Sequence, residues 1–214
     1  MGSSVGGVKE QFLQGASVVL SAVSDPRVAA AWDEASVLEG QTVGGLAGHL
    51  ARGGVWVVGD YLDGELPSTA VDFETATDYY AEVARTLTAA DHVAIRARGA
   101  TVAAAGPVAI AEQLATRLDA LRTRLPAEPP ERVLAVFAGN VMPLDEYLVT
   151  RIVEQVVHLD DLARSIDAEP WPDPPGAADV VIACGTAVGR RNSGDTAMVR
   201  ALFRGDTTGV LPVL

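Results

Sequence analysis

Apolar residues along this chain recur mainly three and four positions apart, which is the period of an amphipathic helix. Phe12, Ala16 and Val19 follow this spacing near the start of the chain, and Leu46 and Leu50 follow it further on. Turn and capping residues separate the periodic stretches and give each one its limits. The pattern predicts helices over residues 8–20, 26–32, 42–62, 74–87, 91–125, 143–166, 177–190 and 195–203, followed by an extended tail to 214.

Several of these limits rest on residue types that favour helix ends. Asp25-Pro26 is typical of a helix start, and Thr42 is a good N-cap for the helix that follows it. Gly106-Pro107 is expected to break or kink the stretch 91–125. The segment 132–137 is β-prone but short, so we expect a small strand or an extended crossover there.

The predicted elements indicate an all-α fold. Aromatic residues make up only 5 % of the chain, and this low content also favours helix over sheet. The simplest arrangement is an up-down bundle of four long antiparallel helices, with short extra helices and the small extended segment near 132–137. No low-complexity linker or internal repeat divides the sequence, so we expect residues 1–214 to form a single domain.

Composition narrows the classes of function. The chain has 214 residues, with 16 Lys+Arg against 28 Asp+Glu and a formal net charge of −12. Such a charge repels nucleic acid and anionic membrane surfaces, so we expect neither as a partner. The uncharged run at residues 99–111 is too short to span a membrane, and the N-terminal residues do not resemble a secretory signal. The single cysteine, Cys184, is expected to be a buried, unreactive thiol and fits a cytoplasmic protein.

The helix predicted over residues 143–166 carries polar side chains along one narrow stripe. Apolar residues cover most of the rest of its surface, an arc far wider than the ~100° of an ordinary surface helix. We therefore expect this helix to lie at the centre of the bundle. The stripe consists of Tyr147, Thr150, Arg151, Glu154, His158, Asp161 and Ser165.

Two residues of this stripe have the spacing of a metal-binding pair. Glu154 and His158 are four residues apart, so their side chains point the same way, about 5–6 Å apart. His49 is the best third ligand, because the glycines around it remove side-chain bulk and indicate close approach of a helix or a ligand. Two imidazoles and one carboxylate leave a fourth position free, as in a catalytic zinc site. The same donor set suits Fe(II), and Ni or Mn also fits. The glycines near His49 are Gly45, Gly48 and Gly53.

Simpler interpretations compete with these assignments. Glu154 and His158 can be solvated neighbours on a helix surface, and His49 can be a hydrogen-bonded core histidine. Arg151 and Glu154, three residues apart, can form a surface ion pair. His92 is expected to be an exposed residue at a helix start.

Two segments of the chain together resemble a known family. The stretch Thr42–Leu50, TVGGLAGHL, is similar to the "T-V-x-x-L-x-x-H-L" opening of the family's second helix. The stretch Arg151–Leu162 resembles its "R-x-x-E-x-x-x-H-x-x-D-L" helix, and Ala201–Gly205 looks like the last-helix motif of single-domain relatives. The family is the metal-binding domain of mycothiol-dependent maleylpyruvate isomerase, within the DinB-like superfamily of four-helix bundles.

The resemblance implies a divalent metal, most commonly zinc, held by one histidine of the second helix and by the Glu and His of the later helix. At the matching positions, these residues are His49, Glu154 and His158. The family further implies mycothiol or a similar small thiol as co-substrate. Arg151 and Asp161 also match motif positions. Arg151 is a candidate contact for a substrate carboxylate, and Asp161 is a candidate acceptor that orients the ring of His158.

These implications predict a metal-dependent enzyme that uses a thiol. A thiolate formed at the metal would add to an electrophilic small molecule, giving S-transfer or thiol-assisted isomerisation. The isomerase that names the family has an additional C-terminal domain, for which residues 171–214 are too few, so we do not expect maleylpyruvate isomerisation itself. A hydrolase with metal-activated water and a non-catalytic metal-binding bundle with a stress-response role are the alternatives. The sequence is compatible with a homodimer.

Overall fold

Helices dominate the computed structural model, which describes residues 7–210 apart from the side chains of residues 84 and 85. The all-α prediction is confirmed, because the strands named below pair only into one small two-stranded sheet. In chain order the elements are α1 (Val8–Val23), α2 (Pro26–Ala30), α3 (Val43–Ala51), η1 (Arg52–Trp56), α4 (Val57–Leu62), α5 (Ala76–Thr86), α6 (Ala89–Ala103), α7 (Pro107–Arg124), η2 (Leu125–Ala127), β1 (Val133–Ala135), η3 (Phe137–Gly139), β2 (Val141–Pro143), α8 (Leu144–Ser165), α9 (Ala177–Ser193) and α10 (Asp195–Arg204).

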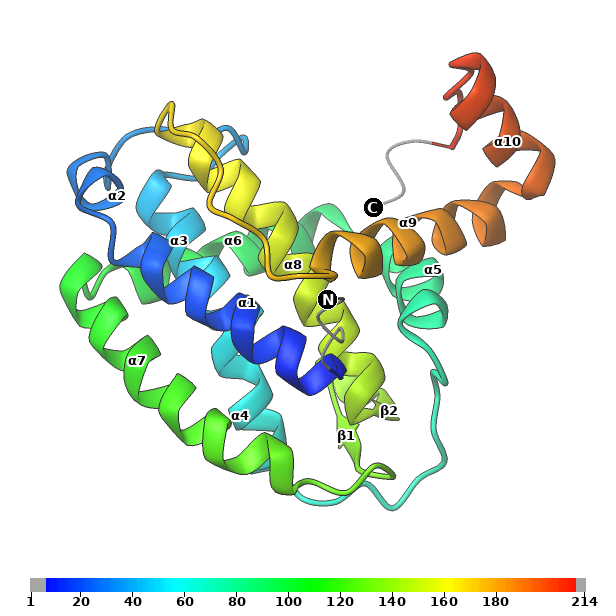
Figure 1. Ribbon diagram of the computed structural model, residues 1–214, viewed down its shortest axis with the longest axis horizontal. Coiled ribbons are helices and arrows are strands. Elements are labelled where there is room, and N and C mark those ends of the chain that lie inside the picture. The colour runs from blue at the N-terminus through cyan, green and yellow to red at the C-terminus, as the bar shows by residue number, and fades with distance from the viewer. Residues whose placement is uncertain (1–6, 211–214) are drawn as a thin grey trace, which may run out of the picture.

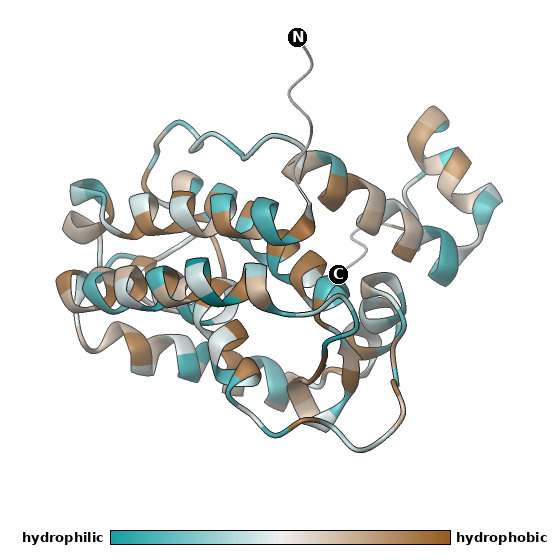
Figure 2. Cartoon of the chain, turned by 60° about the horizontal axis from the view of Figure 1, so that its bottom comes forward, coloured by the Kyte–Doolittle hydropathy of each residue, from teal (hydrophilic) through white to brown (hydrophobic). Residues whose placement is uncertain are grey.

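The main core lies where α1, α3, α7 and α8 pack together (Figure 1). Each of the four helices contributes a fully buried apolar side chain, for example Phe12 from α1, Leu50 from α3, Leu114 from α7 and Leu148 from α8. Burying one such side chain contributes roughly 1.5–3 kcal/mol to folding. Figure 2 shows hydrophobic and hydrophilic residues alternating along the helices, which is the pattern expected of amphipathic helices. As expected of a central helix, α8 packs against α1, α3, α5 and α9.

The helix expected over residues 42–62 is divided by a π-helical turn. The Thr42 hydroxyl accepts a hydrogen bond from the Gly45 amide at 3.0 Å and caps α3, as its sequence position suggested. After α3 the chain continues as the π-helix η1 and then as α4. The glycine pair Gly53-Gly54 lies inside η1. A π-turn leaves backbone carbonyls outside the regular helical ladder, so these groups need partners elsewhere.

The stretch expected over residues 91–125 forms two helices that meet at a bend of 99°. Gly106, at φ +83°, makes the turn, and Pro107 occupies the first position of α7. In the part of the chain that the structure describes, no single helix has the length and apolarity needed to cross a membrane. The bent pair Ala89–Ala103 and Pro107–Ala127 meets that criterion by length and composition alone.

The β-prone segment 132–137 forms one strand of a small hairpin. Strand β1 pairs antiparallel with β2, with Val133 opposite Pro143. The second strand was not predicted, and α8 consequently begins at Leu144 rather than at 143. The turn between the strands contains Ala138 at φ 60°, a conformation that side-chain periodicity does not reveal.

The C-terminal helices α9 and α10 extend away from the four-helix core (Figure 1). Helix α9 packs against α5 and α8, and it continues to Ser193, three residues beyond its expected end. Helix α10 packs against α9, and its Met198 and Ala201 form a small separate apolar cluster with Val210 of the turn that follows. The prediction of an extended tail is wrong for residues 208–210, which form a turn. Residues 211–214 lie outside the described range.

Candidate metal centre

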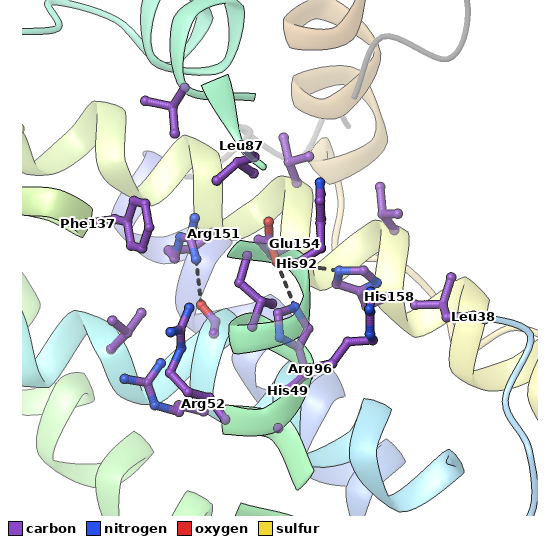
Figure 3. A pocket seen from close by; sticks show the side chains of 18 of the residues that line it. Leu38, His49, Arg52, Leu87, His92, Arg96, Phe137, Arg151, Glu154 and His158 are labelled. Atoms are coloured by element: carbon purple, nitrogen blue, oxygen red, sulfur yellow. Dashed lines mark hydrogen bonds and ion pairs between the residues drawn. The ribbon is translucent and has the colours of Figure 1, made fainter. Parts of the chain in front are cut away.

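Three side chains from two helices meet at one side of the core. His49 comes from α3, and Glu154 and His158 come from adjacent turns of α8. Glu154 Oε2 lies 3.3 Å from His49 Nε2 and 3.5 Å from His158 Nε2. Figure 3 shows the carboxylate between the two imidazole rings, with one dashed contact to each. The structure therefore brings together the three residues that the sequence singled out as metal ligands.

The spacing of these donor atoms suits a divalent cation. Zinc lies about 2.0–2.1 Å from histidine nitrogen or carboxylate oxygen, which places neighbouring donors of a tetrahedral site roughly 3.3–3.4 Å apart. The two measured nitrogen–oxygen distances fall close to this value, and one ligand atom from each residue lies within 4.8 Å of the others. The side chains are only 17–23 % exposed. Two nitrogens and one oxygen on one side of an ion leave room for a further ligand from the cavity.

His49 reaches this position because α3 and α6 approach each other very closely. A Cβ atom on Gly48 would lie 2.5 Å from the carbonyl oxygen of Gly99, and a Cβ on Gly99 would lie 2.7 Å from the Gly45 carbonyl oxygen. Only glycine fits at such distances. The glycines near His49 were interpreted as a sign of close approach by a helix or a ligand, and for Gly48 the structure shows that helix α6 is the neighbour. A Cβ on Gly45 would meet only the Thr42 hydroxyl, at 3.4 Å. Gly53 instead faces the His49 ring.

Asp161 lies one turn beyond His158 and contacts its other ring nitrogen. Asp161 Oδ2 is 3.0 Å from His158 Nδ1, so a proton on Nδ1 is donated to the carboxylate and Nε2 is directed toward Glu154. This is the position that a ring-orienting acceptor occupies in metal sites. Burial lowers the pKa of His158, but the hydrogen bonds to Asp161 and Glu154 outweigh it and raise the pKa to about 9.

Glu154 is held as a carboxylate by its neighbours. Burial raises its pKa, but hydrogen bonds from His158 and His49 and the positive charge of Arg151 together hold the pKa well below the ordinary value. The group is therefore ionised at neutral pH and available as an oxygen ligand. Of the simpler interpretations, a solvated pair of neighbours does not describe these residues, because both side chains are mostly buried and point at His49.

Arg151 is buried beside the site and bound to the backbone of η1. Its Nη1 donates to the Gly53 carbonyl at 2.8 Å, its Nε donates to the Thr150 hydroxyl at 3.1 Å, and the guanidinium lies 4.8 Å from the Tyr147 ring. The surface ion pair with Glu154 is therefore wrong, since Arg151 is 9 % exposed and its contacts are to Gly53 and Thr150. It also lines the cavity described below.

Gln155 has a matching role that the sequence did not suggest. Its Nε2 donates to the Gly54 carbonyl at 3.0 Å and lies 3.5 Å from the Phe12 carbonyl oxygen. Arg151 and Gln155 thus bind the two successive carbonyls of the glycine pair in η1, and they flank Glu154 on α8. The signal for Gln155 was present: it is a polar residue on the apolar arc of α8, where it is 1 % exposed.

A cavity of about 520 Å³ opens beside the three donor side chains. Its lining comes from α3, η1, α4, α5, α6, η3 and α8, with a few loop residues. His92 is exposed, as expected, but it also lines this cavity, so all three histidines of the chain face the same space. Cys184 does not line it. Cys184 is buried as predicted, and burial raises the pKa of its thiol. The other lining residues used below are Arg52, Arg96, Arg98, Arg151 and Tyr61.

Comparisons with known proteins give one match. The family described as mycothiol maleylpyruvate isomerase N-terminal domain matches residues 12–163, which is more than half of the chain. The matched region begins in α1 and ends near the end of α8, so it includes the four core helices and all three donor residues. No curated protein and no solved structure matches the chain.

Proposed function

Because the chain belongs to the mycothiol maleylpyruvate isomerase N-terminal domain family, we propose that it is a divalent-metal-dependent enzyme that uses a small thiol of the mycothiol type. The observation that carries this proposal is the convergence of His49, Glu154 and His158 at one wall of a 520 Å³ cavity. The cavity has room for a thiol and a second small reactant. The reaction proposed is S-transfer to an electrophile or thiol-assisted isomerisation of it.

The donor set determines what the three residues can hold. Imidazole nitrogens and a carboxylate suit zinc best, and they also accept Ni, Fe or Mn. When bound, such a cation supplies a Lewis acid that lowers the pKa of a thiol, so that thiolate is present at neutral pH. His49, Glu154 and His158 would then serve as ligands only. A reaction that consumes a small cellular thiol also fits the cytoplasm, where thiols are kept reduced.

Other side chains of the cavity position the reactants. Asp161 holds the His158 ring through Nδ1, and Arg151 and Gln155 hold η1 against α8 on either side of Glu154. Arg151 has its donors on the Gly53 carbonyl and Thr150, yet it lines the cavity, so its remaining guanidinium nitrogen can contact a substrate carboxylate.

Metal analysis of the purified full chain tests the first part of the proposal. We expect about one divalent ion per chain, and a strong loss of it in His49→Ala, Glu154→Gln and His158→Ala. The matched control is His92→Ala, because His92 lines the same cavity and contributes no atom to the donor cluster. Full metal content in all three ligand variants, or equal loss in the control, would contradict the ligand assignment.

A thiol-consumption assay tests the second part. Metal-loaded protein is incubated with mycothiol and a panel of electrophiles, and the free thiol is measured over time. We expect consumption that stops on chelation and is restored by the metal. Turnover of an ester or amide without the thiol would instead favour a hydrolase, and metal binding with no turnover of either kind would favour a non-catalytic bundle.

A further inference from the structure

Arginines in this acidic chain fall into two groups. Those of the first group each have an aspartate or glutamate within ion-pair distance, and they are Arg27, Arg117, Arg122, Arg124, Arg132, Arg164, Arg190 and Arg191. Arg52, Arg96 and Arg98 belong to the second group, since among the described side chains none of them has a carboxylate partner. All three are half-buried and line the cavity beside the donor cluster.

The lining of this cavity is therefore positive in a protein whose net charge is −12. It includes four arginines, Arg151 among them, and two carboxylates, Glu154 and Asp161. Both carboxylates are engaged with histidines, Glu154 with His49 and His158, and Asp161 with His158. A guanidinium stays charged at any ordinary pH, so the excess of positive charge cannot be removed by loss of a proton. A half-enclosed space with this charge concentrates anions.

Two of the unpaired arginines line the cavity from different helices, η1 and α6. Arg52 follows His49 by three residues, at the first position of η1. Arg98 directly precedes Gly99, the residue at the closest approach of α6 to His49. Figure 3 shows Arg52 and Arg151 on the same side of His49, toward Phe137, whereas Arg96 lies on the other side, toward His158 and Leu38.

The positive charges of three of these arginines all act on the side chain of Tyr61. Burial raises the pKa of its phenol, while the positive charges of Arg151, Arg52 and Arg98 each act to lower it. The three guanidinium groups therefore share a field over the Tyr61 end of the cavity. Tyr61 itself offers a hydroxyl that can donate to an anion.

We propose that Arg52 and Arg98, together with the hydroxyl of Tyr61, form a binding subsite in this cavity for an anionic group, such as a carboxylate, on the electrophilic reactant. The proposal rests on the proposed function for the identity of the reaction, and it adds the class of the second substrate. The thiol is then bound beside His49, Glu154 and His158, and the anionic group of the electrophile is bound toward Tyr61. A neutral electrophile of the same size is a poor ligand for this cavity.

Calorimetric titration of the metal-free full chain tests the subsite without any need for turnover. The probes are malonate, succinate, glutarate and inorganic phosphate, and the neutral comparison is succinamide. We expect at least one of the dianions to bind and succinamide not to bind, with an affinity that falls as salt is added. Arg52→Gln and Arg98→Gln should each weaken the binding roughly tenfold or more, because each removes a charge-assisted hydrogen bond.

The matched control is Arg200→Gln on α10, which changes the net charge by the same amount. Arg200 has no ion-pair partner among the described residues either, but it is exposed and lies outside the cavity. We expect the Arg200→Gln variant to bind the dianion with the same affinity as the unmodified chain. Arg98→Lys, which keeps the charge but not the planar fork, should recover part of the affinity if Arg98→Gln is correctly folded by circular dichroism.

Three results would overturn the subsite: no binding of any dianion, equal binding of succinamide, or equal losses in Arg200→Gln. Because the titration uses metal-free protein, it separates this inference from the proposed function. Anion binding that persists in a protein unable to bind metal would support the subsite and contradict the metal-dependent enzyme.

Discussion

The contact between His158 Nδ1 and Asp161 decides which ring nitrogen of His158 faces Glu154. Without it, the imidazole could present either nitrogen to the cavity, and the donor cluster would lose its geometry. The 3.0 Å separation and the 13 % exposure of the Asp161 side chain make this a part-buried, charge-assisted contact. Its loss should therefore be visible in metal affinity while the fold is unchanged.

Asp161→Asn should weaken divalent-metal binding about 10- to 100-fold, since the variant keeps the shape of the side chain but loses its charge. The neighbouring Asp160 is a matched control, because it is 55 % exposed and lies outside the donor cluster. Competition with a chromogenic chelator measures both affinities. Equal affinities in Asp161→Asn and Asp160→Asn would show that Asp161 does not support the ligand.

Metal binding should release close to one proton at pH 7.5. The pKa of His158 in the metal-free protein is about 9, so its ring is protonated at this pH, and it must lose the proton to act as a ligand. Affinity should accordingly rise with pH and level off above about pH 9. Calorimetry in buffers with different ionisation enthalpies measures the proton count. A count near zero would mean that His158 is neutral before the metal binds.

At the scale of elements, two contacts hold the donor residues in register. Helix α6 lies against α3 through glycines, and α8 is bound to η1 by the hydrogen bonds of Arg151 and Gln155 to the carbonyls of Gly53 and Gly54. A regular α-helix would have used these carbonyls in its own ladder. The π-turn thus gives α3 a fixed attachment to α8 within one turn of His49.

Gly48→Ala should destabilise the protein by about 1–3 kcal/mol, as overpacking does in other well-packed cores. The new Cβ would lie 2.5 Å from the Gly99 carbonyl oxygen, and backbone cannot move aside as a flexible side chain can. The matched control is Gly59→Ala on α4, where the nearest side-chain atom, Leu121 Cδ2, is 4.0 Å from the new Cβ. There we expect no loss, because alanine favours helix over glycine.

Denaturant unfolding of the two variants measures this difference. Metal affinity measured on the same samples tests the link to the site, since Gly48→Ala should also displace His49 and weaken binding. Equal stability of the two variants would mean that α3 and α6 are not in close contact.

At the scale of the whole molecule, the donor residues all lie in the region that the family model matches. The C-terminal arm, which consists of α9 and α10, contributes none of them. All three donor residues lie within residues 12–163, whereas α9 and α10 follow that range. Helix α10 packs against α9 and has its own small apolar cluster. The exposed residues Leu202 and Phe203 lie on this helix, away from the donor cluster.

Removal of residues 195–214 should therefore leave the metal content per chain unchanged. It removes α10 and leaves the core helices, the cavity lining and α9 in place. Elemental analysis, with circular dichroism to check the helical content, measures the outcome. A truncated chain that stays helical but binds no metal would show that the C-terminal arm supports the site.

The sequence by itself determined the features that depend on local spacing. Helical periodicity located the helices, Thr42 marked the start of α3, and the four-residue interval placed Glu154 and His158 on one face, because a helix has the same geometry wherever it forms. The glycines around His49 already made it the best third ligand, and the family resemblance selected the same residue, whereas the assignment of Arg151 as a substrate contact depended on the matching motif. For Arg151, the three-residue spacing suggested a surface ion pair with Glu154, but the Arg151 side chain is buried.

Tertiary structure alone decided how these local pieces meet. The π-turn at Gly53-Gly54 forms where carbonyls find donors on α8, and the close approach of α6 to α3 places Gly99 beside His49. In each of these contacts the two partners are far apart in the sequence, so local periodicity does not predict the contact. The cavity and its positive lining have the same origin, because they exist only where residues from seven separate elements face one space.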